Sequence, residues 1–90
     1  MNMKAKLKAK QQLPKWFKGE LYEEGTVVQN RFGGGEIELN NVELSMYDFV
    51  MGAVIMTKMG SRDTKLITEL RKGLDWFRMN NAEAYMVLLD

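Results

Sequence analysis

Apolar residues cover nearly the whole circumference of the segment Asn41–Met59, NVELSMYDFVMGAVIMTKM, when it is placed on a helix. The clearly polar side holds little more than Asn41, Ser45 and Asp48. A helix with this pattern is buried, either in a protein core or in a bilayer. The uninterrupted apolar run Phe49–Met56 is far shorter than the ~20 residues that span a bilayer. We therefore expect a central core helix and no membrane partner.

Capping residues mark both ends of this helix. Asn40 suits the N-cap position, and Glu43 follows three residues later, as in a capping box. Gly60 is well placed to end the helix in a left-handed conformation. Ser61 or Asp63 is then expected to cap a second helix.

The second helix is strongly amphipathic, because its charged residues lie opposite an apolar stripe. The stripe consists of Leu66, Ile67, Leu70, Gly73, Leu74 and Phe77. Gly73 predicts a close approach of the two helices, with Gly73 opposite Gly52-Ala53. After Asn80-Asn81 interrupts the pattern, a short third helix is expected over Ala82–Leu89. Its dense apolar residues indicate that it docks on the body.

Residues 20–40 have features typical of strands. Thr26-Val27-Val28 is β-branched, and Glu36-Ile37-Glu38-Leu39 alternates charged and apolar side chains. Between them, Gly33-Gly34-Gly35 allows positive φ angles, so we predict a β-hairpin. Glu20-Leu21-Tyr22 is a candidate third strand. An isolated hairpin is marginally stable, so this one is expected to pack on a helix.

These elements predict an α+β fold, in which a β-hairpin of two or three short strands packs on two main helices and a short C-terminal helix. The 90 residues suffice for one domain. A chain of this size buries only ~60% of the surface that its unfolded state exposes. We place the domain at residues 14–90 and a flexible basic arm at residues 1–13, MNMKAKLKAKQQL.

The charges are unevenly distributed along the chain. Six of the 13 Lys and Arg residues lie in residues 1–18, and all 12 Asp and Glu residues come later. Lysines neutralise phosphates and aromatic rings stack on unpaired bases, which makes the arm a candidate nucleic-acid site. The candidate residues are Lys4, Lys6, Lys8, Lys10, Trp16 and Phe17. The alternative, a solubilising tail tethered by the aromatic pair, is favoured because the acidic body offers no basic platform.

The composition excludes several chemistries. There is no Cys and no His, which removes disulfides, Cys/His zinc sites and histidine acid–base catalysis. The absence of Cys also fits a cytoplasmic protein. The glycine triplet lacks the Lys and hydroxyl residue of a phosphate-binding loop, and a strand follows it instead of a helix.

The carboxylates offer the remaining candidates for chemistry. Glu36 and Glu38 are interpreted as a solvated strand face. Asp48 either marks the solvent side of the first helix or pairs with Arg62 or Arg71, because a buried carboxylate needs a partner. We therefore expect a non-enzymatic protein without a cofactor or a metal site.

Methionine is abundant, with eight residues in the chain and four of them on the first helix. Methionine fills irregular cores and also adapts to pliable interfaces. The other elements cover about three sides of the first helix. On the remaining side we expect a homo-oligomer seam at Met51, Ile55 and Met59.

Two parts of the chain are similar to known sequences. Residues 74–85, LDWFRMNNAEAY, are similar to the junction between tetratricopeptide repeats, but one junction cannot form a solenoid, so we interpret it as a helix restart. PKWFKG at residues 14–19, YEEG at 22–25, ELSMYDFVMGA at 43–53 and the chain from Trp76 onward resemble small uncharacterised proteins of marine tailed phages, especially cyanophages. The lysine-rich arm lies outside this resemblance.

The phage resemblance implies a viral origin, the cytoplasm of an infected host cell and a phage or host protein as partner. It implies no site residues. The expected function is that of an accessory protein acting through protein–protein contacts or self-association, with nucleic-acid association as the alternative.

Overall fold

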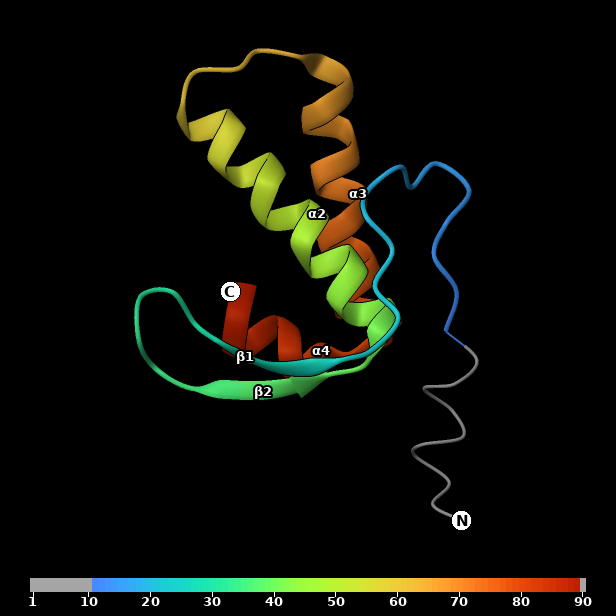
Figure 1. Ribbon diagram of the computed structural model, residues 1–90. Helices are drawn as coiled ribbons and strands as arrows, with labels where there is room; N and C mark the ends of the chain where they lie inside the picture. Colours follow the sequence, from blue (N-terminus) through green and yellow to red (C-terminus); the bar gives the residue numbers. More distant parts are fainter. Residues whose placement is uncertain (1–10, 90) are drawn as a thin grey trace.

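The computed structural model describes residues 11–89. The elements are β1 (Thr26–Gln29), β2 (Glu36–Leu39), α2 (Asn41–Lys58), α3 (Thr64–Asn80), α4 (Ala82–Ala84) and a π-helical turn, η1 (Tyr85–Leu89). Figure 1 shows α2 and α3 as a helical hairpin that stands on the β-hairpin, with the C-terminal helix beside the strands. The predicted α+β fold, with its β-hairpin, two main helices and short C-terminal helix, is confirmed.

The predicted capping box begins α2. The Asn40 side chain accepts a hydrogen bond from the backbone N–H of Glu43 at 2.8 Å, and the Glu43 carboxylate accepts one from the N–H of Asn40 at 3.0 Å. Each residue thus satisfies a backbone donor that the helix itself cannot satisfy. This reciprocal pair fixes the direction in which the chain leaves β2.

Gly60 ends α2 as predicted, with a φ of 101°. The N–H groups of Gly60 and Ser61 donate back to the carbonyls of Thr57 and Met56, respectively, which is the Schellman arrangement. Asp63 is the N-cap of α3 and accepts hydrogen bonds from two backbone N–H groups. Of the two candidate caps, Asp63 is therefore the one used.

Gly73 is buried in the contact between α3 and α2. A Cβ atom at this position would lie 2.8 Å from Cγ2 of Val50 and 3.4 Å from Sδ of Met46. The predicted close approach is confirmed, but the predicted partner Gly52 was wrong, because Gly52 is exposed with no atom within 4 Å of such a Cβ. Gly52 follows Val50 by two residues, which turns it about 160° around the helix, away from α3.

The β-hairpin has the predicted glycine turn. β1 and β2 are antiparallel, with Val28 opposite Ile37 and Thr26 opposite Leu39. The three glycines at positions 33–35 have φ angles of 80°, 108° and 141°. The side-chain amide of Asn30 donates to the carbonyl of Val87 at 2.7 Å, which ties the turn to η1. The hairpin is therefore held by contacts to two elements, α2 and the C-terminal turn η1.

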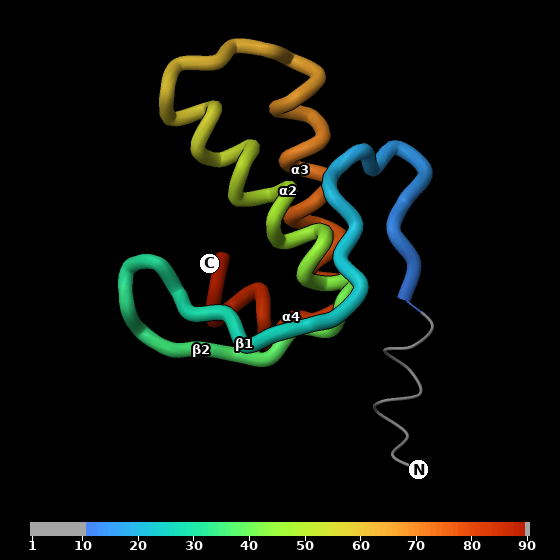
Figure 2. The backbone as a smooth tube through the Cα atoms, in the orientation of Figure 1, coloured from blue at the N-terminus to red at the C-terminus, as the bar shows by residue number. Residues whose placement is uncertain are grey.

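Residues 11–25 form a strap that runs beside α2 and α3 before the chain enters β1, as the blue-to-cyan tube in Figure 2 shows. The Trp76 indole donates to the carbonyl of Gln12 at 3.1 Å. The backbone N–H of Tyr22 donates to the hydroxyl of Ser45 at 3.0 Å. The candidate strand Glu20–Tyr22 is therefore part of the strap, and the sheet within the described residues has two strands.

The core lies where the helices, β2 and the C-terminal turn meet. Its fully buried side chains are Leu39, Met46, Val50, Phe77 and Ala84. Ser45 was expected on the polar edge of α2, but this expectation was wrong, because the strap covers it and leaves it 1% exposed. Asp48 is exposed, as expected for the solvent side of the helix.

Candidate functional site

An apolar groove of about 280 Å³ lies between the turn of the β-hairpin and the C-terminal half of α2. We call it the contact groove. It is lined by Arg31, Phe32, Met51, Val54, Ile55, Lys58 and Met59. All three residues of the predicted seam, Met51, Ile55 and Met59, line this groove.

Large apolar side chains around the contact groove are unusually open to solvent. Phe32 is 84% exposed and Met59 is 81% exposed. Met56 and Ile55 on the adjoining surface of α2 are 52% and 40% exposed. Exposed apolar residues that occur singly need no explanation, but residues that gather around a groove are typical of interaction sites.

Cationic groups border the contact groove. Nζ of Lys58 lies 5.5 Å from the centre of the Phe32 ring, a cation–π contact that holds the turn over the helix. Arg31 lines the groove and lies near Tyr47. Burial raises the pKa of the Tyr47 hydroxyl, and the positive charge of Arg31 opposes part of this rise.

The charge at the other end of the exposed face of α2 is negative. Asp48 is exposed, and no ion pair joins it to Arg62 or Arg71 in the described part of the chain, where Arg78 pairs with Asp75. The pKa of the Tyr22 hydroxyl is raised by desolvation and then by the negative charge of Asp48. Asp48 thus lies at the solvent side, beside the strap.

The burial of the Glu43 side chain was not predicted from the sequence. Its side chain is 0% exposed, although the capping box suggested only a helix start. Its carboxylate accepts hydrogen bonds from the side-chain amides of Gln11 at 3.0 Å and Asn81 at 2.9 Å, in addition to the N–H of Asn40. We call this set the Glu43 junction. It joins the strap, the start of α2 and the turn between α3 and α4.

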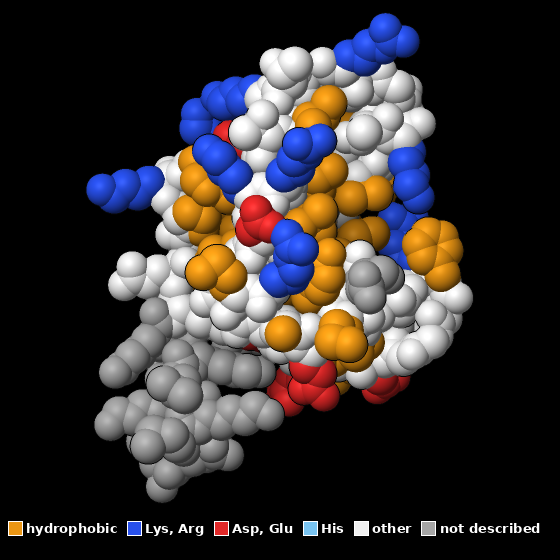
Figure 3. All heavy atoms as spheres, turned by 180° about the vertical axis from the view of Figure 1, so that it is seen from behind, with side chains coloured by type: hydrophobic (Ala, Val, Ile, Leu, Met, Phe, Trp, Pro, Cys, Tyr) orange, Lys and Arg blue, Asp and Glu red, His pale blue; other side chains and the backbone are white. Residues whose placement is uncertain are grey.

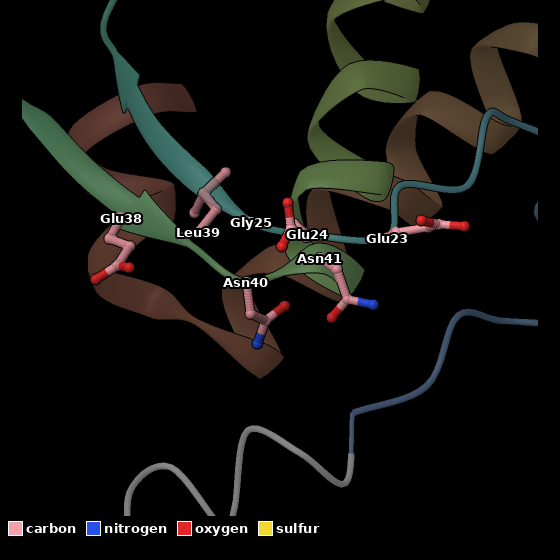
Figure 4. Close-up of a pocket in the computed structure, with 7 residues that line it drawn as sticks. All are labelled: Glu23, Glu24, Gly25, Glu38, Leu39, Asn40 and Asn41. Atoms are coloured by element: carbon pink, nitrogen blue, oxygen red, sulfur yellow. The ribbon is translucent and has the colours of Figure 1, made fainter.

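An acidic hollow of about 340 Å³ lies where the end of the strap and the end of β2 meet the start of α2. It is lined by Glu23, Glu24, Gly25, Glu38, Leu39, Asn40 and Asn41. Figure 4 shows that its three carboxylates point in different directions and do not converge. Among residues 11–89, no group of three or more acidic side chains is placed to hold a metal ion. The hollow therefore offers neither a cation cage nor a general acid–base pair.

The predicted nucleic-acid residues lie in two parts of the chain. Lys4, Lys6, Lys8 and Lys10 are outside the described residues. The rings of Trp16 and Phe17 are half-buried, and the centre of each lies 5.7 Å from the centre of the Phe49 ring. This packing supports the tethering interpretation of the aromatic pair, and the nucleic-acid role stays a prediction.

On the face seen from behind, apolar and basic side chains are intermingled over the helical part (Figure 3). In Figure 3, apolar side chains lie open between Lys and Arg side chains over the helical part, and acidic side chains gather along the lower edge. No helix in the described part of the chain has the length and apolar character that crossing a membrane requires.

Comparison with protein-family models, with curated proteins and with solved structures gives no match to this chain. The geometry of the chain itself is therefore the basis for a functional proposal. The viral origin implied by the phage resemblance stays a prediction.

Proposed function

We propose that this protein acts without catalysis, as an accessory protein that binds another protein surface in the contact groove. The observation that supports this most directly is the convergence of exposed apolar side chains on one groove, with Phe32 84% and Met59 81% exposed. Leaving this surface in water costs about 25 cal/mol for each Å² of apolar area. A partner that covers it recovers this free energy.

The form of the groove favours a protein as the ligand. Its wall is made of Met51, Ile55 and Met59, whose flexible or branched side chains can repack around an inserted side chain. Arg31 and Lys58 at its border supply positive charge that can contact a protein partner, and they are not part of a catalytic group of residues. The setting proposed for this contact is the cytoplasm of an infected host cell, as the phage resemblance implies.

The test uses a photo-cross-linking amino acid placed at position 59 in cells that produce the protein. Position 79 is the matched control, because Met79 is 86% exposed and is not part of the groove. We expect discrete cross-linked adducts from position 59, their loss on Phe32→Ser, and no corresponding adducts from position 79. Absence of adducts at position 59, or the same adducts from both positions, would contradict the proposal.

A further inference from the structure

The exposed residues on the outer face of α2 follow the spacing of a helix–helix seam. Asp48, Gly52, Ile55 and Met59 are all exposed. They are separated by four, three and four residues, which is the spacing of the core positions of a two-stranded coiled coil. The described chain supplies no second helix on this face, because α3 packs on the side of Val50 and Met46.

Gly52 makes this face open to close approach. A Cβ atom at Gly52 would have no atom within 4 Å, so the space above the backbone is empty. A helix with a glycine in its exposed apolar stripe allows another helix to come near its backbone. A glycine alone does not identify the approaching partner. The charges at the two ends of the exposed α2 face, at Asp48 and Lys58, indicate which partner fits.

The exposed face of α2, from Asp48 to Met59, has opposite charges at its two ends. Asp48 lies at the beginning, and Lys58 lies ten residues later beside Met59. If a second copy of α2 lies antiparallel on this face, Gly52 faces Ile55 of the second copy and Asp48 faces the Met59 and Lys58 end. The two-fold axis then repeats each contact, so two acid–base pairs form. A parallel pair would place Asp48 beside Asp48, which is repulsive.

We infer that the occupant of the contact groove is a second copy of this chain, which packs its α2 antiparallel on the α2 of the first. This inference rests on the proposed function and names its partner. The contact groove of about 280 Å³ shares Ile55 and Met59 with this face of α2, so the second helix covers both of these exposed side chains. The seam from Asp48 to Met59 is only about 16 Å long, so the dimer is of moderate affinity and its assembly depends on concentration.

The experiment measures the mass of the full chain by sedimentation equilibrium from low to high micromolar concentration. We expect a reversible monomer–dimer equilibrium. Asp48→Lys and Lys58→Glu should each weaken the dimer about tenfold, and the double variant Asp48→Lys/Lys58→Glu should restore most of the affinity. Glu38→Lys, an exposed charge change outside the seam, is the control and should leave the equilibrium unchanged.

A disulfide test determines the direction of the two helices. The chain contains no cysteine, so Gly52→Cys and Ile55→Cys can be mixed without background. The antiparallel arrangement predicts that the mixed disulfide between the two variants forms faster than either symmetric one. Preferential Gly52→Cys self-pairing would overturn the antiparallel arrangement.

A monomer at every concentration would overturn the dimer. In that case, adducts from position 59 that contain a different protein would leave the proposed function standing with another occupant. If position 59 also gives no adduct, both the dimer and the proposed function fail. The two failures are therefore distinguishable.

Discussion

The two parts of helix α2 are both rich in apolar residues, yet their surroundings are opposite. Up to Ala53 the helix is held by the strap, β2, α3 and the C-terminal turn, and it contains five buried residues. From Val54 onward no residue of the helix is buried. Figure 1 shows the reason, because the far ends of α2 and α3 project away from the β-hairpin. The apolar pattern thus correctly predicts that α2 packs against other elements, but these elements bury only its first part.

Apolar residues in this one helix therefore have two different surroundings. In the first part they form the core, and their polar neighbours Glu43 and Ser45 are buried with hydrogen-bond partners. In the second part they supply most of the α2 wall of the contact groove, to which the first part adds Met51. The two parts of α2 should therefore respond differently to substitution.

Glu43→Leu should reduce the free energy of unfolding by about 3–5 kcal/mol, because the partly buried donors of Gln11, Asn40 and Asn81 all lose their acceptor. The measurement is urea unfolding followed by circular dichroism. The matched variant Glu38→Leu alters an exposed strand residue and should change the free energy by no more than about 0.5 kcal/mol. Equal effects of the two variants would show that the Glu43 junction does not stabilise the fold.

Met46→Ala and Met59→Ala make the same substitution in the two parts. Met46 is 0% exposed, so its truncation should cost about 2–5 kcal/mol through lost burial and a cavity. Met59 is 81% exposed, and its truncation should cost less than about 0.5 kcal/mol in the monomer. The pair is measured by urea unfolding at low protein concentration. Similar losses would abolish the distinction between the two parts.

Two glycines on facing helices should respond with opposite signs. Gly73→Leu forces atoms into Val50 and should cost at least about 1–3 kcal/mol by overpacking. Gly52→Ala fills empty space on an exposed helix face and should stabilise the monomer by up to about 1 kcal/mol through helix propensity. Thermal unfolding distinguishes them, since the midpoints should move in opposite directions. A lower midpoint for Gly52→Ala would mean that this face is covered.

The smallest effect concerns pH. Burial raises the pKa of Tyr47 above its ordinary value of 10.0, so the unfolded chain loses this proton at a lower pH than the folded protein. The free energy of unfolding should therefore fall as the pH rises through 10 and beyond. Tyr47→Phe should make this fall smaller, measured by urea unfolding at about pH 9 and about pH 11. An unchanged slope would show that Tyr47 titrates alike in both states.

Local chemistry made much of the fold predictable. The capping box, the glycine at the end of α2 and the glycine turn of the hairpin each depend on residues that are close in sequence. The amphipathic period of α3 is also a local property. These features were predicted because their physical cause lies within a few residues of each other.

Features that depend on distant residues were not predictable. The Glu43 donors Gln11 and Asn81 are 32 and 38 residues away, and no local pattern shows that they meet. Likewise, Met51, Ile55 and Met59 were predicted as a seam from the helix pattern, but Phe32 was missed. It lies in a turn between Arg31 and the glycines, and only the fold brings that turn to α2.

The Glu43 junction also has a consequence for how the chain folds during synthesis. When Glu43 leaves the ribosome, two of its donors are already made, but Asn81 follows 38 residues later. At a synthesis rate of ~5–20 residues per second, this interval lasts roughly 2–8 s. During that time the N-terminal part of α2 lacks a complete α3 and the C-terminal turn η1, which cover it in the folded protein. The apolar residues of this helix therefore stay without their complete cover until the C-terminal turn η1 is translated.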